Sequence, residues 1–181
     1  MTGKTHIAAG IATCIVLTQV TGLHEADTAT LIVGGICGAI LPDICHAGSK
    51  IGRRFPLLAK VTQLLFGHRT VTHSLLFVIV VWHLLASYGS YVPAMRDGVV
   101  IGMISHLVLD AATAGGIALY WPLRQKIRLP LYTKTGSLTE HALFVLCSAI
   151  IMWYGCVILF SHPFDDIFSF RFADVLDVGH T

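Results

Sequence analysis

The chain has 181 residues, of which 55% are hydrophobic and 12% are charged, and its formal net charge is +2. Soluble domains carry about 25% charged residues, so this composition excludes intrinsic disorder and argues against an ordinary cytosolic domain. It also argues against a nucleic-acid partner, because the basic residues are few and lie in two loops rather than along one stripe. The remaining class is an integral membrane protein, with one membrane domain over 1–161 and an acidic, aromatic tail over 162–181.

Apolar runs predict five membrane helices, over residues 6–22, 28–41, 74–92, 98–119 and 142–160. A helix needs about 17–25 apolar residues to cross a bilayer. The last three runs meet that length, the first is marginal and the second is short. We therefore expect an all-α, polytopic membrane helix bundle of about five transmembrane helices.

The short second run contains three glycines, Gly34, Gly35 and Gly38. Small residues let helix backbones approach closely, so these glycines indicate helix packing rather than exposure to lipid. Whether this segment crosses the membrane fully or is re-entrant stays open, and a re-entrant segment would reduce the count to four.

With five membrane crossings, most of the basic residues fall on one side of the membrane. One side collects 10 of the 12 basic residues: Lys4, Lys50, Arg53, Arg54, Lys60, Arg69, Arg124, Lys126, Arg128 and Lys134. The positive-inside rule places that side in the cytoplasm. We expect a multi-pass protein of the bacterial inner membrane with a cytoplasmic N-terminus.

Ionisable residues recur at the predicted cytoplasmic ends of these helices, where they are costly and indicate function. They are His6, Asp43, His46, His68, His73 and Glu140, together with His106 and Asp110 at i, i+4 spacing inside the fourth helix. All five helices thus bring polar side chains to one cytoplasm-facing pocket.

Imidazole and carboxylate groups together are typical ligands of zinc and other first-row divalent metals. We expect a divalent metal, zinc first and manganese second, held by His6, Asp43, His46, His68, His73, His106 and Asp110. Arg69 is suited to pair with a phosphate. Glu140 is a candidate ligand or general base.

The motifs together resemble the YdjM-like family of LexA-regulated, inner-membrane, metal-dependent hydrolases. The resemblance covers roughly residues 2–140 and is carried by four pieces: Thr5-His6, Leu41-Pro42-Asp43-Ile44-x-His46, Gly67-His68-Arg69-x-x-Thr72-His73-Ser74 and Ser105-His106-x-x-x-Asp110. It implies a membrane-embedded hydrolase that depends on metal. More remotely, the family looks like the helical zinc phospholipase C group.

One position departs from the family pattern, which commonly reads PDIDH where this chain has Cys45 in place of the second Asp. If that Asp is a ligand, Cys45 either substitutes as a softer thiolate or leaves one metal site weaker. If it is not a ligand, the exchange changes little.

Three functions fit these residues. The first is a hydrolase that cleaves a phosphoester of a lipid or lipid-linked substrate at the cytoplasmic face, because membrane embedding favours a lipid substrate. The second is a metal or proton transporter that uses the same His/Asp cluster, since buried ionisable pairs also mark ion pathways. The third is a membrane protein with a structural metal. The substrate and the oligomeric state are not predicted.

Overall fold

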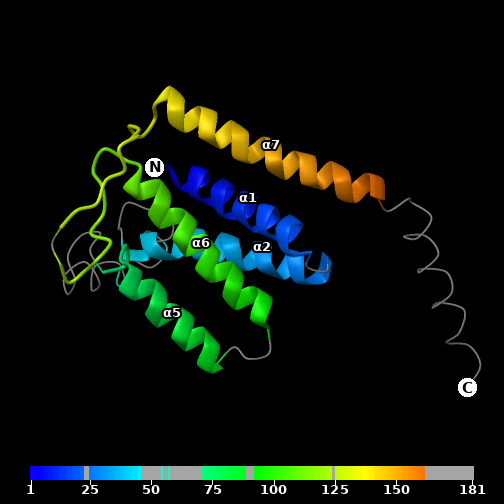
Figure 1. Ribbon diagram of the computed structural model, residues 1–181, viewed down its shortest axis with the longest axis horizontal. Helices are drawn as coiled ribbons and strands as arrows, with labels where there is room; N and C mark the ends of the chain where they lie inside the picture. Colours follow the sequence, from blue (N-terminus) through cyan, green and yellow to red (C-terminus); the bar gives the residue numbers. More distant parts are fainter. Residues whose placement is uncertain are drawn as a thin grey trace, which may run out of the picture.

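The computed structural model describes residues 1–22, 25–45, 54, 57, 71–88, 92–123 and 125–161. The described residues form helices and no strand, which confirms the all-α prediction (Figure 1). The named elements are α1 (Gly3–Thr21), α2 (Glu25–Ile40), the 3-10 helix η1 (Leu41–Cys45), α5 (Leu75–Tyr88), α6 (Pro93–Ala111) and α7 (Leu138–Ser161).

Glycine and proline set several of these boundaries. Gly22 ends α1 in the left-handed region at φ 66°, and its N–H donates to the carbonyl of Thr18 at 2.9 Å, which is a common helix stop. Pro93 begins α6, where a missing N–H costs nothing. Pro42 cannot continue an α-helix, so α2 gives way to the 3-10 helix η1 that carries Asp43.

The helix α6 lies at the centre of the bundle, packed against α2, α1 and α5, while α7 lies along α1 and extends past it (Figure 1). The buried core between α5 and α6 contains Val78, Met103 and Leu107. A second apolar cluster joins α1 to α7 through Ala8, Ala12 and Cys147.

The closest approach in the bundle is between α2 and α6. A Cβ atom built at Gly34 or Gly38 of α2 would collide with the backbone of α6, and one at Gly98 or Gly102 of α6 would collide with the backbone of α2. The prediction that the glycines of 28–41 serve helix packing is confirmed. This contact fixes the C-terminal end of α2 beside α6.

Of the five expected membrane helices, the described residues contain two that are long and apolar enough to cross a bilayer, Asp27–Ile44 and Leu138–Phe160. The prediction of five is therefore not met on length and hydropathy. The helices α1 and α6 have 19 residues each, but their polar side chains lower the mean hydropathy. The apolar α5 has only 14 residues, about 21 Å of helix.

The predicted helix over 98–119 extends too far, because α6 ends at Ala111. The hydroxyl of Thr113 donates to the Asp110 carbonyl at 2.7 Å, a local bond that competes with helical hydrogen bonding. Gly116 then adopts φ 58°, and the chain turns back so that Ile117 pairs with Ile127. The apolar composition of 112–119 therefore serves a folded connection rather than a membrane helix.

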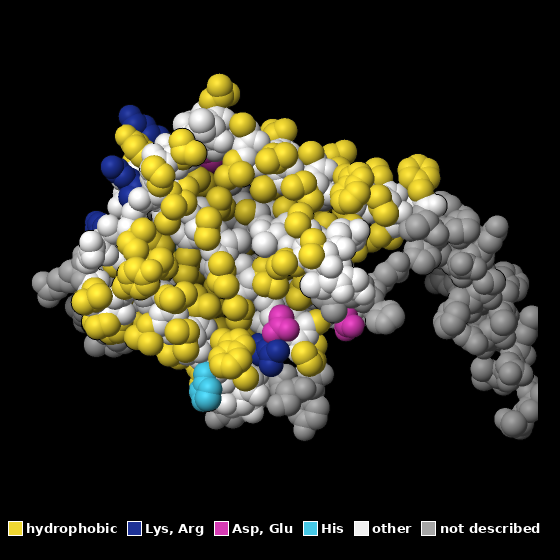
Figure 2. All heavy atoms as spheres, viewed as in Figure 1, with side chains coloured by type: hydrophobic (Ala, Val, Ile, Leu, Met, Phe, Trp, Pro, Cys, Tyr) yellow, Lys and Arg dark blue, Asp and Glu magenta, His cyan; other side chains and the backbone are white. Residues whose placement is uncertain are grey.

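Hydrophobic side chains cover much of the face in Figure 2. The large exposed hydrophobic residues of α7 include Trp153, Leu159 and Phe160. Only 11% of the candidate span in α7 is buried inside the protein. The tail of 162–181, His46, His68 and Arg69 lie outside the described residues, as does the Cys45 side chain. The domain boundary at 161 stays a prediction.

Candidate metal centre

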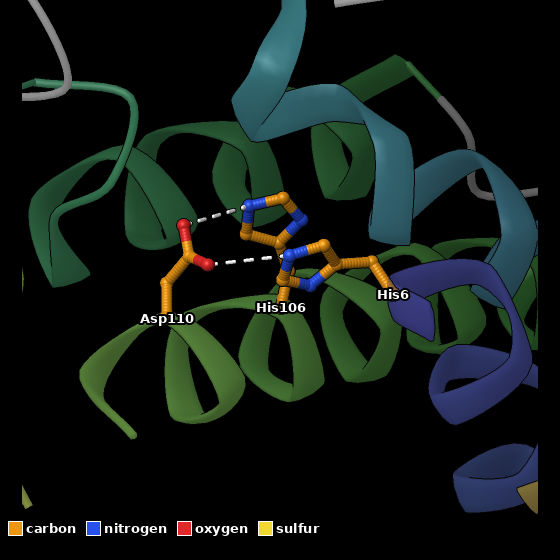
Figure 3. A group of neighbouring side chains, drawn as sticks. All are labelled: His6, His106 and Asp110. Carbon is orange, nitrogen blue, oxygen red and sulfur yellow. Dashed lines mark ion pairs between the residues drawn. The ribbon is translucent and has the colours of Figure 1, made fainter. Parts of the chain in front are cut away.

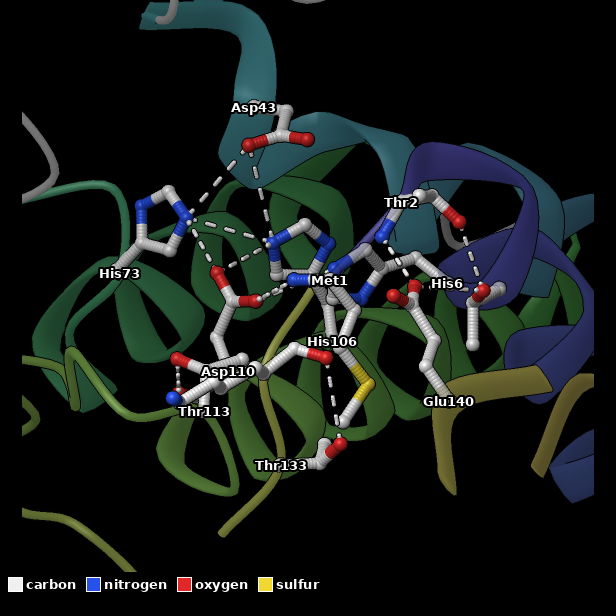
Figure 4. A network of polar contacts seen from close by, with 12 residues as sticks. Met1, Thr2, His6, Asp43, His73, His106, Asp110, Thr113, Thr133 and Glu140 are labelled. Atoms are coloured by element: carbon white, nitrogen blue, oxygen red, sulfur yellow. Dashed lines mark hydrogen bonds and ion pairs between the residues drawn. The ribbon is translucent and has the colours of Figure 1, made fainter. Parts of the chain in front are cut away.

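Five of the predicted site residues meet at one end of the bundle, although they come from four separate parts of the chain (Figure 4). His6 lies in the first turns of α1, Asp43 in η1 and His73 just before α5, while His106 and Asp110 share one face of α6. Four of the five side chains are at most 2% exposed, and Asp43 is 17% exposed.

Four donor atoms form one cluster: Asp43 Oδ1, His73 Nε2, His106 Nε2 and Asp110 Oδ2. His73 Nε2 lies 3.3 Å from His106 Nε2, 3.4 Å from Asp110 Oδ2 and 3.7 Å from Asp43 Oδ1. His106 Nε2 lies 3.5 Å from Asp110 Oδ2 and 4.0 Å from Asp43 Oδ1. For metal–ligand bonds of about 2.1 Å, neighbouring ligands of a tetrahedral zinc ion are about 3.4 Å apart. These five distances are close to that spacing, which suits the coordination of one ion by donors of this cluster.

The second oxygen of Asp110 faces the start of the chain. Asp110 Oδ1 lies 3.2 Å from His6 Nε2 and 3.0 Å from the ammonium group of Met1 (Figures 3 and 4). The His6 ring stacks on the His106 ring, with their centroids 3.8 Å apart. His6 Nδ1 is buried without a hydrogen-bond partner in the described part of the chain. Asp110 thus joins His6 to the four-donor group.

Each of the two central histidines has a second partner that orients its ring. His106 Nδ1 lies 2.7 Å from the Ala39 carbonyl, which only accepts, so Nδ1 carries the proton and Nε2 keeps its lone pair. His73 Nδ1 lies 3.1 Å from Thr72 Oγ1. Burial lowers the pKa of His73, which favours the neutral imidazole that coordinates metals.

The Thr72-His73-Ser74 motif combines orientation with a helix cap. Ser74 Oγ accepts from the Phe77 N–H at 3.2 Å and donates to the Val71 carbonyl at 2.6 Å, as an N-cap residue of α5 does. The cap fixes the first turn of α5, while Thr72 holds the His73 ring that precedes it. Each residue of the motif thus has a distinct role in placing one imidazole.

Two groups of three side chains meet the geometry for a metal ion, His6 with His106 and Asp110, and Asp43 with His73 and His106. They share His106, whose single free lone pair can bind one ion. The donor set, its burial and the orphaned His6 nitrogen fit a first-row divalent ion such as zinc.

Glu140 is also buried, but it belongs to neither metal group and its oxygens accept bonds from elsewhere. Glu140 Oε1 accepts from the Thr2 N–H at 2.6 Å and from the Thr5 hydroxyl at 3.0 Å, and Oε2 accepts from the Gly136 N–H at 2.6 Å. The carboxylate therefore ties the start of α1 to the start of α7. Its role as ligand or general base stays a prediction.

The sequence did not point to three partners of this site: the Met1 ammonium, the Ala39 carbonyl and the Thr72 hydroxyl. A backbone carbonyl has no signature in a sequence, and the Met1 contact spans 109 residues. Thr72 could have been found, because it directly precedes a candidate ligand.

A membrane protein with a buried His/Asp cluster is the class that this fold and site define. The family described as YdjM inner membrane protein matches residues 1–164, and the chain belongs to this family. It is 34% identical over 163 residues to "Inner membrane protein YdjM" of Escherichia coli (strain K12), covering 84% of this chain and 81% of that protein. It is 48% identical over 143 residues to "Uncharacterized protein YvsG" of Bacillus subtilis (strain 168), covering 78% and 86%. No solved structure matches the chain.

Proposed function

We propose that this protein is a membrane-bound, metal-dependent hydrolase that cleaves a phosphoester of a lipid or lipid-linked substrate. The observation that carries the proposal is the cluster of Asp43, His73, His106 and Asp110, in which each histidine Nε2 lies within 3.3–4.0 Å of the other histidine Nε2 and of both carboxylates. Buried ionisable side chains in a membrane protein are costly and mark functional sites. Two carboxylates offset the charge of a divalent ion, and two imidazole nitrogens add further ligands.

The proposed cofactor is zinc, with manganese as the second choice. Such an ion, when bound, polarises a phosphoryl oxygen and lowers the pKa of a bound water. Asp43, His73, His106 and Asp110 would hold it, and His6 would support it from the other oxygen of Asp110. Arg69 is proposed to pair with the substrate phosphate, and His46 and His68 are proposed as further ligands.

We propose further that α1, α2, α5, α6 and α7 all cross the bacterial inner membrane, with the N-terminus and the metal centre on the cytoplasmic side. Support comes from the placement of the site residues at the start of α1, the end of α2, the start of α5 and the end of α6. Consecutive crossings place those four helix ends on the same side. Ten of the 12 basic residues fall on that side as well.

The metal content of the purified protein tests the proposal first. Elemental mass spectrometry on the detergent-solubilised protein should find at least one zinc or manganese ion per chain in the wild type. His73→Ala and Asp110→Ala should retain less than a tenth of it. His83→Ala is the matched control, because His83 is an exposed histidine of α5.

The same four proteins are then assayed for release of phosphate or of a phosphorylated headgroup from bacterial phospholipids. Hydrolysis by the wild type and by His83→Ala, absent in the other two variants, is the expected result. If the protein binds metal without hydrolysing lipid, and zinc uptake into vesicles depends on His106, the protein is a transporter and not a hydrolase. A protein that binds no metal under any loading condition would end the proposal.

A further inference from the structure

The connection between α6 and α7, residues 112–137, folds into a defined lobe at the end of the bundle that carries the metal centre (Figure 1). Ile117 and Ile127 exchange two backbone hydrogen bonds of 3.0 and 2.8 Å. Thr133 donates its N–H to the Ala112 carbonyl at 2.8 Å and accepts from the Ala114 N–H at 3.2 Å. The lobe therefore presents its side chains from a fixed backbone.

Large apolar and aromatic side chains of the lobe point outward. Leu131 is 90% exposed, Leu123 64%, Tyr120 53% and Tyr132 50%. Leu138, the first residue of the candidate span in α7, is 85% exposed. The lobe continues directly into the candidate membrane span of α7. A bilayer around that span would place the apolar side chains of the lobe at the depth where the bilayer meets water.

The charge of the lobe has one sign. The sequence of 112–137 contains four basic residues and no acidic residue. Lys126, Arg128 and Lys134 are exposed, and the Arg128 guanidinium lies 4.5 Å from the centre of the Tyr132 ring. Figure 2 shows Lys and Arg side chains gathered, among hydrophobic ones, mainly at the end of the molecule where α7 begins.

We propose that this lobe binds the headgroups of anionic phospholipids in the bilayer. Exposed leucine and tyrosine side chains reach the acyl boundary, and the basic side chains beside them meet the phosphates. A neutral or zwitterionic lipid surface would satisfy the apolar side chains and leave the positive charge without a counterpart. The proposal does not depend on hydrolysis.

The lobe also contacts the backbone next to the metal centre. The Leu129 N–H donates to the carbonyl of Ala111, the residue after Asp110, at 2.9 Å. The Leu75 N–H, two residues after His73, donates to the Leu119 carbonyl at 2.9 Å. A lipid headgroup on the lobe is therefore held beside the site that we propose to cleave phosphoesters.

Fluorescence quenching by brominated lipids tests the proposal, with Trp121 of the lobe as the reporter. The protein carries Trp82→Phe and Trp153→Phe, so that Trp121 is its one tryptophan. It is reconstituted into nanodiscs of phosphatidylcholine with increasing fractions of brominated phosphatidylglycerol, or of brominated phosphatidylcholine as the reference. We expect half-maximal quenching at a several-fold lower fraction of the anionic lipid.

The variant Lys126→Gln/Arg128→Gln/Lys134→Gln should lose this preference. Each basic side chain removed should lower the affinity for the anionic lipid about fivefold. Arg96→Gln is the control, because Arg96 pairs with Asp97 at the opposite end of α6. Equal thermal unfolding of both variants shows that they are folded. Equal quenching by the two lipids, or a preference that survives in the triple variant, would overturn the proposal. Displacement of the anionic lipid by millimolar glycerol phosphate would overturn it in favour of a site for soluble phosphoesters.

Discussion

Asp110 uses its two oxygens for two different groups of partners. Oδ2 contacts His73 and His106, whereas Oδ1 contacts His6 and the Met1 ammonium. One carboxylate therefore connects α1, α6 and the residues before α5. A buried carboxylate needs a positive charge nearby, and on the Oδ1 side the Met1 ammonium supplies one at 3.0 Å.

Thr72 offers a test of how the rings are held. When His73 Nε2 is the ligand, Nδ1–H donates to the Thr72 hydroxyl 3.1 Å away. Loss of such an outer partner weakens metal binding by about 10–100-fold. We expect that weakening in Thr72→Val, measured by competition with a chelator of known affinity. Thr72→Ser keeps the hydroxyl and should bind metal as the wild type does. Equal affinities in all three proteins would show that Thr72 does not orient the ligand.

Glu140 can be tested as a positioning residue against its predicted role as a general base. In Glu140→Gln an amide N–H group replaces one oxygen, so one of the donors from Thr2, Thr5 or Gly136 loses its acceptor. An unsatisfied buried donor costs about 1–3 kcal/mol. The melting temperature should fall by about 2–12 °C in scanning fluorimetry.

Asp97→Asn provides the matched control for Glu140→Gln, because it removes a surface ion pair, and such pairs contribute little to stability. A Glu140→Gln protein that melts with the wild type but has lost all hydrolysis would instead indicate a general base.

At the scale of elements, the crossing of α2 and α6 places Asp43 against His106. A Cβ at position 38 would fall within the backbone of Val99. We expect Gly38→Ala to cost about 1–3 kcal/mol through overpacking and to reduce the bound metal, since the helices must separate. Gly155→Ala adds the same methyl group where no atom lies within 4 Å, and should keep both stability and metal. Thermal unfolding and metal analysis of the two variants decide whether the close contact builds the site.

The elements show what local sequence can and cannot reveal here. The glycines of α2 and the polar residues at helix ends were predictable, because small residues and buried charges are exceptional in apolar runs. The end of α6 at Ala111 was not predictable, since residues 112–119 are as apolar as a membrane helix. The turn that ends the helix depends on the conformation of Gly116 and on the backbone hydrogen bonds between Ile117 and Ile127. The contact of Glu140 with Thr2 joins residues 138 apart and has no local signal.

At the scale of the whole molecule, the proposed ion would hold several helices of the bundle together at one end. Its candidate ligands come from three places: η1, the turn that precedes α5, and α6 itself. His6 links α1 to them through its contact with Asp110. On the far side α7 packs mainly on α1, and its apolar surface is available to lipid.

Metal removal should consequently destabilise the entire bundle. A ligand at about 1,000 times its Kd adds about 4 kcal/mol to the stability of the state that binds it. For a chain of this size we expect dialysis against a chelator to lower the melting temperature of the wild type by about 8–16 °C, and added zinc to restore it. His73→Ala should melt at one temperature with and without chelator, because it has lost a ligand, whereas His83→Ala should respond as the wild type does. A wild type that melts at the same temperature in both conditions would show that the helices hold the cluster together without an ion.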